Sequence, residues 1–149
     1  MSTITKEELQ DLIGNKDLVG KYFQIEVVSF SDTSAECMMP LTDKHKNPLG
    51  IAHGGAIFSL ADMCFETACH AAGRFCVNTQ SSISFLNKGI GGKLFAKASL
   101  LKNGSKLVVY QVDITDIRNT LVAQGQITGY CLGNVAELIE KTKTSSYDG

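Results

Sequence analysis

The stretch GGAIFSLADMCFETACHAA, residues 54–72, decides the fold of this chain. Its apolar residues are spread around almost the whole circumference of a helix, and Gly73 directly after it is a natural C-terminal stop. A helix of this kind has to be enclosed on most sides, because its apolar surface would otherwise contact water. Asp62 and Glu66 lie within it, whereas a membrane span needs about twenty residues with few or no charges. We therefore predict one long buried helix and no membrane association.

Alternation of apolar and polar residues predicts strands on both sides of this helix. Before it, residues 23–30 and 35–40 alternate across a turn at Ser31-Asp32, which is typical of a hairpin. A polar loop follows over residues 42–52. After the helix, the same period predicts four strands in a meander, at residues 77–86, 94–101, 107–117 and 121–132.

These elements define the fold class. An antiparallel sheet has to bury one face, and the long helix is the only large apolar element that can cover it. The sequence therefore predicts an α+β fold in which an antiparallel sheet of about six strands wraps around one central helix. Thr5 and Glu8 have the spacing of a capping box and predict a short N-terminal helix at about residues 5–14. Without repeats or linkers, residues 1–149 are predicted to form a single domain, with a core at about 22–132 and a C-terminal helix and tail at 134–149.

The composition excludes several classes of protein. The net charge is −1 and no block of lysines or arginines stands out, so we expect no nucleic-acid partner. The five cysteines are odd in number and form no CxxC pair, which argues against a disulfide framework and against a structural zinc site. No basic segment followed by an apolar run begins the chain, so we expect no secretory signal and a cytoplasmic protein with free, buried thiols.

His53, Gly54 and Gly55 stand at the start of the long helix. The first N–H groups of a helix have no intrahelical partner, and the helix dipole adds partial positive charge to them. Glycine lets a ligand approach such N–H groups closely, because it has no side chain. An oxygen that becomes negative during a reaction would be stabilised at this position.

Asp62 and Glu66 are the only acids on the long helix, and their spacing of four places them on one face. A carboxylate in an apolar setting is costly without partners, which favours a functional role. Burial would raise the pKa of either acid and make it a better base near neutral pH. Glu66 is nearer the end of the helix and could instead pair with a lysine. Of the remaining histidines, we expect His45 to be a solvated loop residue and His70 a packing or surface residue.

The segment NPLGIAHGGAIFSLAD, residues 47–62, resembles the hotdog-fold thioesterase superfamily, most closely the PaaI-type and 4-hydroxybenzoyl-CoA thioesterases. The resemblance extends over about residues 23–132, and its specific feature is an Asn, then His-Gly-Gly, then an Asp nine residues after the His. It implies that Asp62 is the catalytic carboxylate, acting as a base toward water or as a nucleophile toward the thioester. It also implies that the Gly54 N–H polarises the thioester carbonyl, that Asn47 lies beside that carbonyl or the attacking water, and that His53 shapes the turn.

The resemblance further implies an acyl-CoA substrate and no metal or organic cofactor. Relatives often carry Ser or Thr where this chain has Asn78, and they bind coenzyme A along segments that match residues 85–90 and 102–107. Candidate substrate-binding residues are therefore Gly55, Glu66, Asn78, Phe85, Asn87, Lys88, Lys102, Gly104 and Lys106. Phe58, Met63, Phe65 and Phe85 are candidates to line an apolar acyl pocket.

The resemblance implies a homodimer that pairs into a homotetramer, with each active site at a dimer interface. The predicted function is hydrolysis of an aryl- or short- to medium-chain acyl-CoA. Two alternatives share the fold: a module that binds acyl-CoA without hydrolysing it, and an acyl-thioester dehydratase. The dehydratase is the weaker of the two, because no second suitable histidine precedes the helix.

Overall fold

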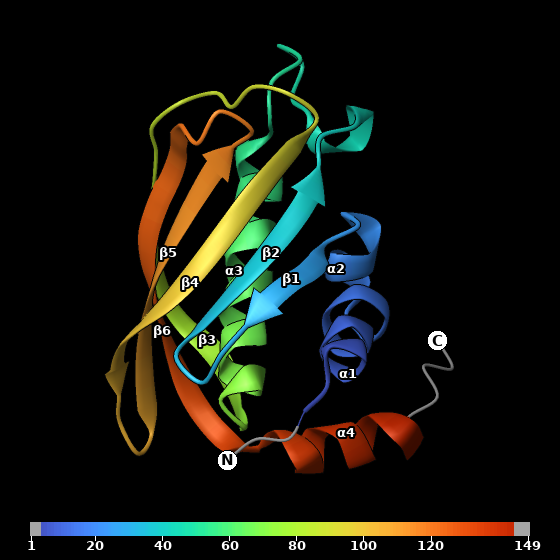
Figure 1. Ribbon diagram of the computed structural model, residues 1–149, viewed down its shortest axis with the longest axis vertical. Helices are drawn as coiled ribbons and strands as arrows, with labels where there is room; N and C mark the ends of the chain where they lie inside the picture. Colours follow the sequence, from blue (N-terminus) through green and yellow to red (C-terminus); the bar gives the residue numbers. More distant parts are fainter. Residues whose placement is uncertain (1–3, 145–149) are drawn as a thin grey trace.

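The computed structural model describes residues 4–144 as a curved antiparallel sheet wrapped around a long helix (Figure 1). The sheet consists of β1 (Glu26–Phe30), β2 (Ser34–Pro40), β3 (Arg74–Phe85), β4 (Lys93–Asn103), β5 (Leu107–Asp116) and β6 (Leu121–Asn134). The helices are α1 (Lys6–Asp11), α2 (Leu18–Tyr22), the central α3 (Gly54–Ala71) and α4 (Val135–Thr144). The predicted α+β class, with six strands around one long helix and short flanking helices, is confirmed. Residues 145–149 of the predicted tail lie outside the described residues.

The order of the strands across the sheet is β1-β2-β4-β5-β6-β3. The predicted four-strand meander is therefore wrong for β3, which pairs with β6 and not with β4. The segment after β3 is too long for a tight hairpin turn, so it crosses the end of the sheet and delivers β4 to the side of β2 (Figure 1). As a result β1 and β3 form the two edges of the sheet.

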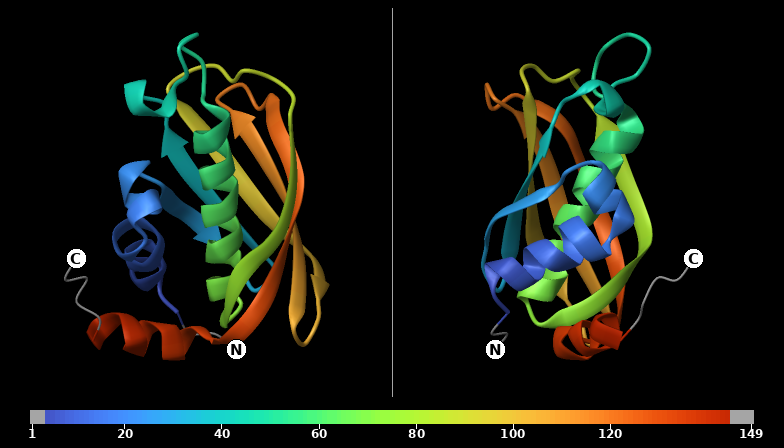
Figure 2. Two further views of the ribbon diagram at one scale, coloured as in Figure 1. Left: turned by 180° about the vertical axis from the view of Figure 1, so that it is seen from behind. Right: turned by 90° about the vertical axis from the view of Figure 1, so that its right-hand side faces the viewer.

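Helix α3 lies against the concave face of the sheet, with α1 and α2 beside it (Figure 2). It ends at Ala71, with Ala72 as the C-cap, because Gly73 adopts a left-handed φ of 85°. The residues of α3 that remain at least partly exposed follow one stripe: Gly54, Gly55, Phe58, Ser59, Asp62 and Glu66. The prediction of a helix enclosed on most sides is confirmed, and the stripe is the side that its own chain leaves open.

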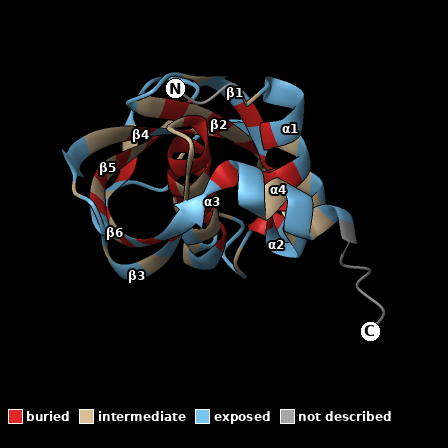
Figure 3. Ribbon diagram, turned by 90° about the horizontal axis from the view of Figure 1, so that it is seen from below, coloured by how far each residue is buried: buried red, intermediate tan, exposed pale blue. Residues whose placement is uncertain are grey.

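Seen along α3, buried residues line the inside of the curved sheet and exposed residues its outside (Figure 3). Helix α4 crosses the end of the fold beneath α3 (Figure 2). It extends to Thr144, within the range predicted for the C-terminal helix and tail. No helix within residues 4–144 is long and apolar enough to cross a membrane.

The N-terminal segment differs from the prediction. The capping box of Thr5 and Glu8 is present, but α1 ends at Asp11 and passes into a π-helical turn at Leu12–Lys16. A second short helix, α2, then begins because the carboxylate of Asp17 accepts hydrogen bonds from the first N–H groups of α2.

The first strand begins later than predicted. Gln24 has a left-handed φ of 59°, so the alternating residues before Glu26 belong to the turn after α2 and not to a strand. Ile25 keeps its predicted inward position and is 1% exposed. The third strand begins earlier than predicted, at Arg74, because Gly73 already reverses the chain.

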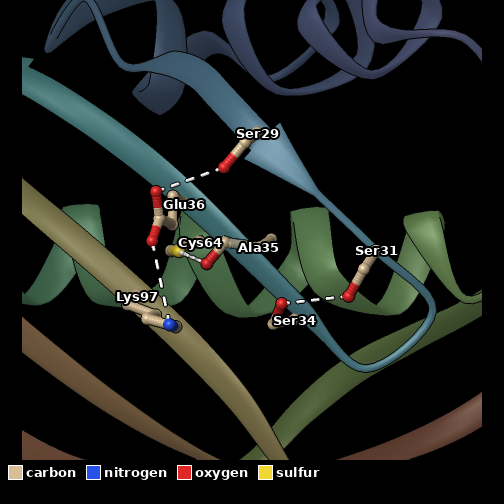
Figure 4. A network of polar contacts seen from close by, with 7 residues as sticks. All are labelled: Ser29, Ser31, Ser34, Ala35, Glu36, Cys64 and Lys97. Atoms are coloured by element: carbon tan, nitrogen blue, oxygen red, sulfur yellow. Dashed lines mark hydrogen bonds and ion pairs between the residues drawn. The ribbon is translucent and has the colours of Figure 1, made fainter.

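In the β1–β2 hairpin, β2 shows the predicted alternation of buried and more exposed side chains, whereas a bulge at Val28 interrupts the alternation in β1. Figure 4 shows the polar contacts of this hairpin. The Sγ of Cys64 on α3 donates to the backbone oxygen of Ala35 at 3.4 Å on the inner face. On the outer face, Glu36 accepts from the Oγ of Ser29 at 3.1 Å and lies 3.9 Å from the Nζ of Lys97. The hairpin is thus held to α3 on one side and to β4 on the other.

The cysteines are free and buried, as predicted; they are Cys37, Cys64, Cys69, Cys76 and Cys131. Within residues 4–144, no cluster of three or more His, Cys, Asp or Glu side chains is arranged to hold a metal ion.

Candidate active site

The start of α3 is built by His53. Its backbone is extended and its Nδ1 accepts a hydrogen bond from the Gly55 N–H at 2.8 Å, so His53 is the N-cap of the helix. Because the Gly55 N–H already has this acceptor, Gly55, a candidate substrate-binding residue, does not offer its N–H to a ligand in this conformation. Among residues 4–144 the Gly54 N–H has no acceptor, so it is the amide that a ligand oxygen can reach.

The loop before α3 is organised by Asn47. Its Oδ1 accepts hydrogen bonds from the backbone N–H groups of Leu49 at 2.9 Å and of Ile51 at 3.3 Å. The polar side chain thus closes the turn that leads to His53. Asn47 thus shapes the loop, and among residues 4–144 its NH₂ group has no hydrogen-bond acceptor, so that group is available to a ligand.

His45 is buried, which corrects the expectation of a solvated loop residue. It is 0% exposed, its Nε2 donates to the backbone oxygen of Phe23 at 2.7 Å, and its Nδ1 accepts from the backbone N–H of Thr42 at 3.1 Å. Its own backbone oxygen accepts from the N–H of His53 at 2.7 Å. His45 therefore anchors the turn that starts α3, a role that depends on contacts far apart in the sequence.

Asp62 is held by a side chain from β3. The Nδ2 of Asn78 donates to the Oδ1 of Asp62 at 2.9 Å, and Ser81 contacts the same amide group of Asn78. Burial raises the pKa of Asp62 above its ordinary value, the hydrogen bond from Asn78 opposes that rise, and the charge of Asp17 adds to it. The structure thus brings two predicted site residues together, and Ser81 is a residue that sequence reasoning missed.

Glu66 lies one turn further along the same face of α3. Burial and the neighbouring charges of Asp62 and Asp17 raise the pKa of Glu66 to about 8, so its carboxyl is mostly neutral at pH 7. No lysine within residues 4–144 forms an ion pair with it, which sets aside the alternative of a surface pair.

Phe85, at the end of β3, covers the start of α3. A Cβ placed on Gly54 would lie 3.6 Å from the Cζ of Phe85, so the ring stands beside the open amide. Phe85 is 53% exposed and Phe58 is 38% exposed, whereas Met63 and Phe65 are buried. Met63 and Phe65 therefore belong to the core and not to an accessible acyl pocket, which corrects half of that expectation.

The segment after Phe85 is fixed at both ends. The Nδ2 of Asn87 donates to the backbone oxygen of Leu121 at 2.8 Å, and the buried carboxylate of Asp116 accepts from the N–H of Ile90 at 3.0 Å. Lys88 lies between these anchors and is exposed. Asp116 is a second residue that sequence reasoning missed, since nothing in the local pattern distinguishes it from the end of a strand.

The other predicted coenzyme A segment lies at the opposite end of the sheet. Lys102 and Lys106 are exposed on either side of the β4–β5 turn, and the N–H of Gly104 donates to the backbone oxygen of Leu107 at 2.9 Å to close it. Arg74, at the beginning of β3, donates to the backbone oxygen of Ser105 at 2.8 Å. This turn is therefore near the C-terminal end of α3, so one chain does not bring its two predicted coenzyme A segments together (Figure 1).

The open amide and the acid are also separated within one chain. Gly54 and Asp62 are eight residues apart on one helix, which places them about 12 Å apart along its axis. A single thioester carbonyl cannot contact both groups of the same chain, because the two contacts lie within about 3 Å of the reacting atoms.

Comparison with known proteins agrees with this architecture. Residues 49–123 match the sequence profile of the Thioesterase superfamily. The acyl-coenzyme A thioesterase PaaI of Escherichia coli is 32% identical over 72% of this chain and 77% of that protein. The thioesterase HI1161 of Haemophilus influenzae is 26% identical over 89% of this chain and 93% of its own, with a TM-score of 0.81. A Streptococcus mutans protein whose structure contains acetyl-CoA is 30% identical over 74% of this chain and 90% of its own, with a TM-score of 0.70. The match over half of the chain, the PaaI relative and the shared architecture together make this protein a member of the Thioesterase superfamily with the hotdog fold.

Proposed function

We propose that this protein is an acyl-CoA thioesterase in which Asp62 supplies or activates the nucleophile. The observation that carries the proposal is the position of Asp62: a carboxylate on the open stripe of an otherwise buried helix, with a raised pKa and the Asn78 amide as its hydrogen-bond donor. A carboxylate is costly in such surroundings, so its presence there argues for chemistry.

The protein itself supplies the groups that the reaction needs, from two copies of the chain. The thioester carbonyl accepts a hydrogen bond from the Gly54 N–H, which stabilises the negative oxygen as the carbon becomes tetrahedral. Asp62 either takes a proton from the attacking water or attacks the carbonyl itself to give a mixed anhydride that water then hydrolyses. In both routes the carbon–sulfur bond breaks, the thiolate of coenzyme A leaves and takes up a proton, and the free acid is released. We propose that no metal or organic cofactor takes part.

A second copy of the chain completes the site in this proposal. The about 12 Å between Gly54 and Asp62 within one chain requires an amide from elsewhere, and a two-fold partner can present its own Gly54 to this Asp62. Large apolar side chains stand exposed around the open stripe, namely Leu49, Phe58, Val77, Phe85 and Leu86. Strand β3 also has a free edge, and exposed apolar surface beside an unpaired edge favours association. We propose a homodimer built on this face and a homotetramer of two such dimers.

In the proposed dimer, the partner subunit can also bring the two predicted coenzyme A segments, residues 85–90 and 102–107, close to each other. The segment after β3, which carries Lys88, crosses one end of the sheet, and the β4–β5 turn between Lys102 and Lys106 lies at the other end (Figure 1). A two-fold arrangement would bring one end of each chain toward the opposite end of its neighbour. These lysines and the backbone of Gly104 are the proposed contacts for the phosphates of coenzyme A. Because all the described cysteines are free, we propose a reducing, cytoplasmic location.

The non-catalytic alternative uses the same open face of α3 but gives Asp62 no role. The amide start of α3 and the exposed aromatic residues would bind an acyl-CoA whether or not hydrolysis follows. The two functions therefore differ in one observable, the release of free coenzyme A.

The test is turnover of an acyl-CoA panel, aryl and short to medium chain, with free coenzyme A measured by a thiol-reactive dye. The Asp62→Asn variant is expected to lose at least about a hundredfold in turnover, because it can neither accept a proton nor attack. Asp32→Asn, at an exposed turn, is the matched control and should behave as the wild type. Near-normal turnover by a folded Asp62→Asn would end the assignment, as would wild-type protein that binds the panel but releases no thiol.

Two further measurements address the route and the assembly. Single turnover in water labelled with heavy oxygen transfers the label to Asp62 only if the carboxylate is the nucleophile. Size-exclusion chromatography should give a dimer or tetramer, and a clean monomer with full activity would rule out the shared site.

A further inference from the structure

We propose that Ser81 is a positioning residue that holds the Asn78 amide against Asp62, through a β-bulge at Thr79. This inference rests on the proposed function, because it assigns Ser81 a role in setting the reactivity of the same carboxylate. Ser81 belongs to no part of the motif that carries the family resemblance.

The bulge is what brings Ser81 to the site. Asn78 pairs with Gly129 and Gln80 pairs with Thr128, so Thr79 is an extra residue without a partner on β6. In a regular strand, residues three apart point to opposite faces of the sheet. The extra residue restores Ser81 to the face of Asn78, and both side chains are half-buried there.

A continuous chain of hydrogen bonds connects Ser81 to Asp62 through the side-chain amide of Asn78. The Oγ of Ser81 donates to the Oδ1 of Asn78 at 2.9 Å and is 2.6 Å from its Nδ2, so it contacts both atoms of the amide group. The same Nδ2 donates to Asp62 at 2.9 Å. Ser81 therefore fixes the plane of the amide, because a partial rotation about the Cβ–Cγ bond would break these contacts. Asp62 selects Nδ2 as the amide atom that faces it, because Oδ1 has no proton to donate. Thr79 is itself held, because its Oγ1 donates to the backbone oxygen of Thr128 at 3.1 Å.

By holding the Asn78 amide in place, Ser81 favours the charged form of Asp62. The hydrogen bond from Asn78 is the favourable contribution that lowers the pKa of Asp62 against the effect of burial. If Ser81 loses its hydroxyl, the amide samples other orientations and the hydrogen bond to Asp62 is formed for less of the time. The carboxylate is then protonated at a higher pH than in the wild type.

The experiment compares Ser81→Thr with Ser81→Val, two variants of nearly equal shape that differ in the hydroxyl, and both suit a strand. Release of coenzyme A is followed as kcat/KM from acidic to neutral pH with a dithiodipyridine reagent, which reacts with thiols in acidic solution. Ser81→Val should move the acidic limb of the profile upward by about 0.5 to 1 pH unit, the effect of losing about one ordinary hydrogen bond. Ser81→Thr should retain the wild-type limb. Ser82→Ala, on the exposed neighbour, is the control and should leave the profile unchanged.

A double-mutant cycle with Asn78→Ala separates positioning from a general effect on folding. In the Asn78→Ala background, Ser81→Val should produce no further shift, because there is no amide left to hold. Equal shifts in both backgrounds would overturn the inference, and so would a wild-type profile for Ser81→Val. If Asp62→Asn is inactive while the Ser81 variants titrate as the wild type, this inference alone fails. If Asp62→Asn is fully active, the proposed function and the inference fail together.

Discussion

The Nδ1 of His53 lies 2.8 Å from the backbone nitrogen of Gly55, and this hydrogen bond gives neighbouring amides of α3 different roles. The Gly55 N–H closes the helix end. Within the described residues the Gly54 N–H has no acceptor, and Gly54 stands at the start of the open stripe on which Asp62 also lies. A single side chain thus selects which amide can meet a substrate oxygen.

His53→Ala should lower the free energy of unfolding by about 1 kcal/mol, because the helix loses the side-chain acceptor at its N-cap. His53→Asn should restore most of that stability, since asparagine is among the best N-cap residues. Urea titrations of the three proteins measure both effects. Equal stability of His53→Ala and the wild type would show that the cap contributes nothing.

Gly54→Ala should fold normally yet hydrolyse thioesters poorly. The new methyl group would have only an ordinary contact with Phe85, at 3.6 Å, and alanine is a better helix former than glycine by about 0.5–1 kcal/mol. The same methyl group stands beside the open amide and hinders the approach of a carbonyl oxygen, so kcat/KM should fall by about tenfold or more.

Gly92→Ala is the matched control, because a Cβ there meets nothing within 4 Å. Thermal melting measures the stability of both variants, and release of coenzyme A measures their kcat/KM. A well-folded Gly54→Ala with undiminished kcat/KM would remove the Gly54 amide from the reaction.

Glu66→Gln should abolish a pH dependence of stability between about pH 4.5 and 8. The pKa of Glu66 is raised from 4.5 to about 8 in the folded protein, so the neutral acid is favoured by the fold. Below pH 4.5 the Glu66 carboxyl is protonated in both the folded and the unfolded state, so it does not change the free energy of unfolding. Between pH 4.5 and 8 the carboxyl is ionised in the unfolded chain alone, so the free energy of unfolding falls as the pH rises. Above pH 8 the variant should therefore be more stable than the wild type, relative to their difference at pH 4.5.

Denaturant titrations at fixed protein concentration measure this dependence, because association would otherwise add to stability. Glu7→Gln, at an exposed position of α1, is the control and should follow the wild type. Parallel stability curves for Glu66→Gln and the wild type across this range would contradict the raised pKa of Glu66.

Local sequence patterns predicted most elements of this fold. The apolar helix at 54–72 and the alternating strands were correctly predicted because both depend on side chains a few residues apart. The same reasoning failed at residues 18–25, where Asp17 caps an extra helix and the positive φ of Gln24 interrupts an apparently regular alternation. A period-two pattern does not reveal that one residue within it turns the chain.

Strand order lay beyond such reasoning. Alternation of apolar and polar residues indicates that a segment is a strand, but not which strand it pairs with. The predicted meander therefore puts β3 beside β4, whereas in the structure β3 lies beside β6. The burial of His45 was missed for a related reason, since its partner Phe23 lies 22 positions earlier in the chain.

By itself the sequence determined the buried helix, its glycine start, the two acids on one face and the motif of residues 47–62, because each of these is set by residues close together in the chain. Only the tertiary structure decided that Asn78 reaches Asp62, that Ser81 holds that amide, and that His53 leaves the Gly54 N–H open. The first two contacts depend on how β3 folds back along α3 and on one extra residue opposite β6, and the third on the orientation of a single ring. Such contacts follow from the arrangement of whole elements in space, which no short stretch of sequence specifies.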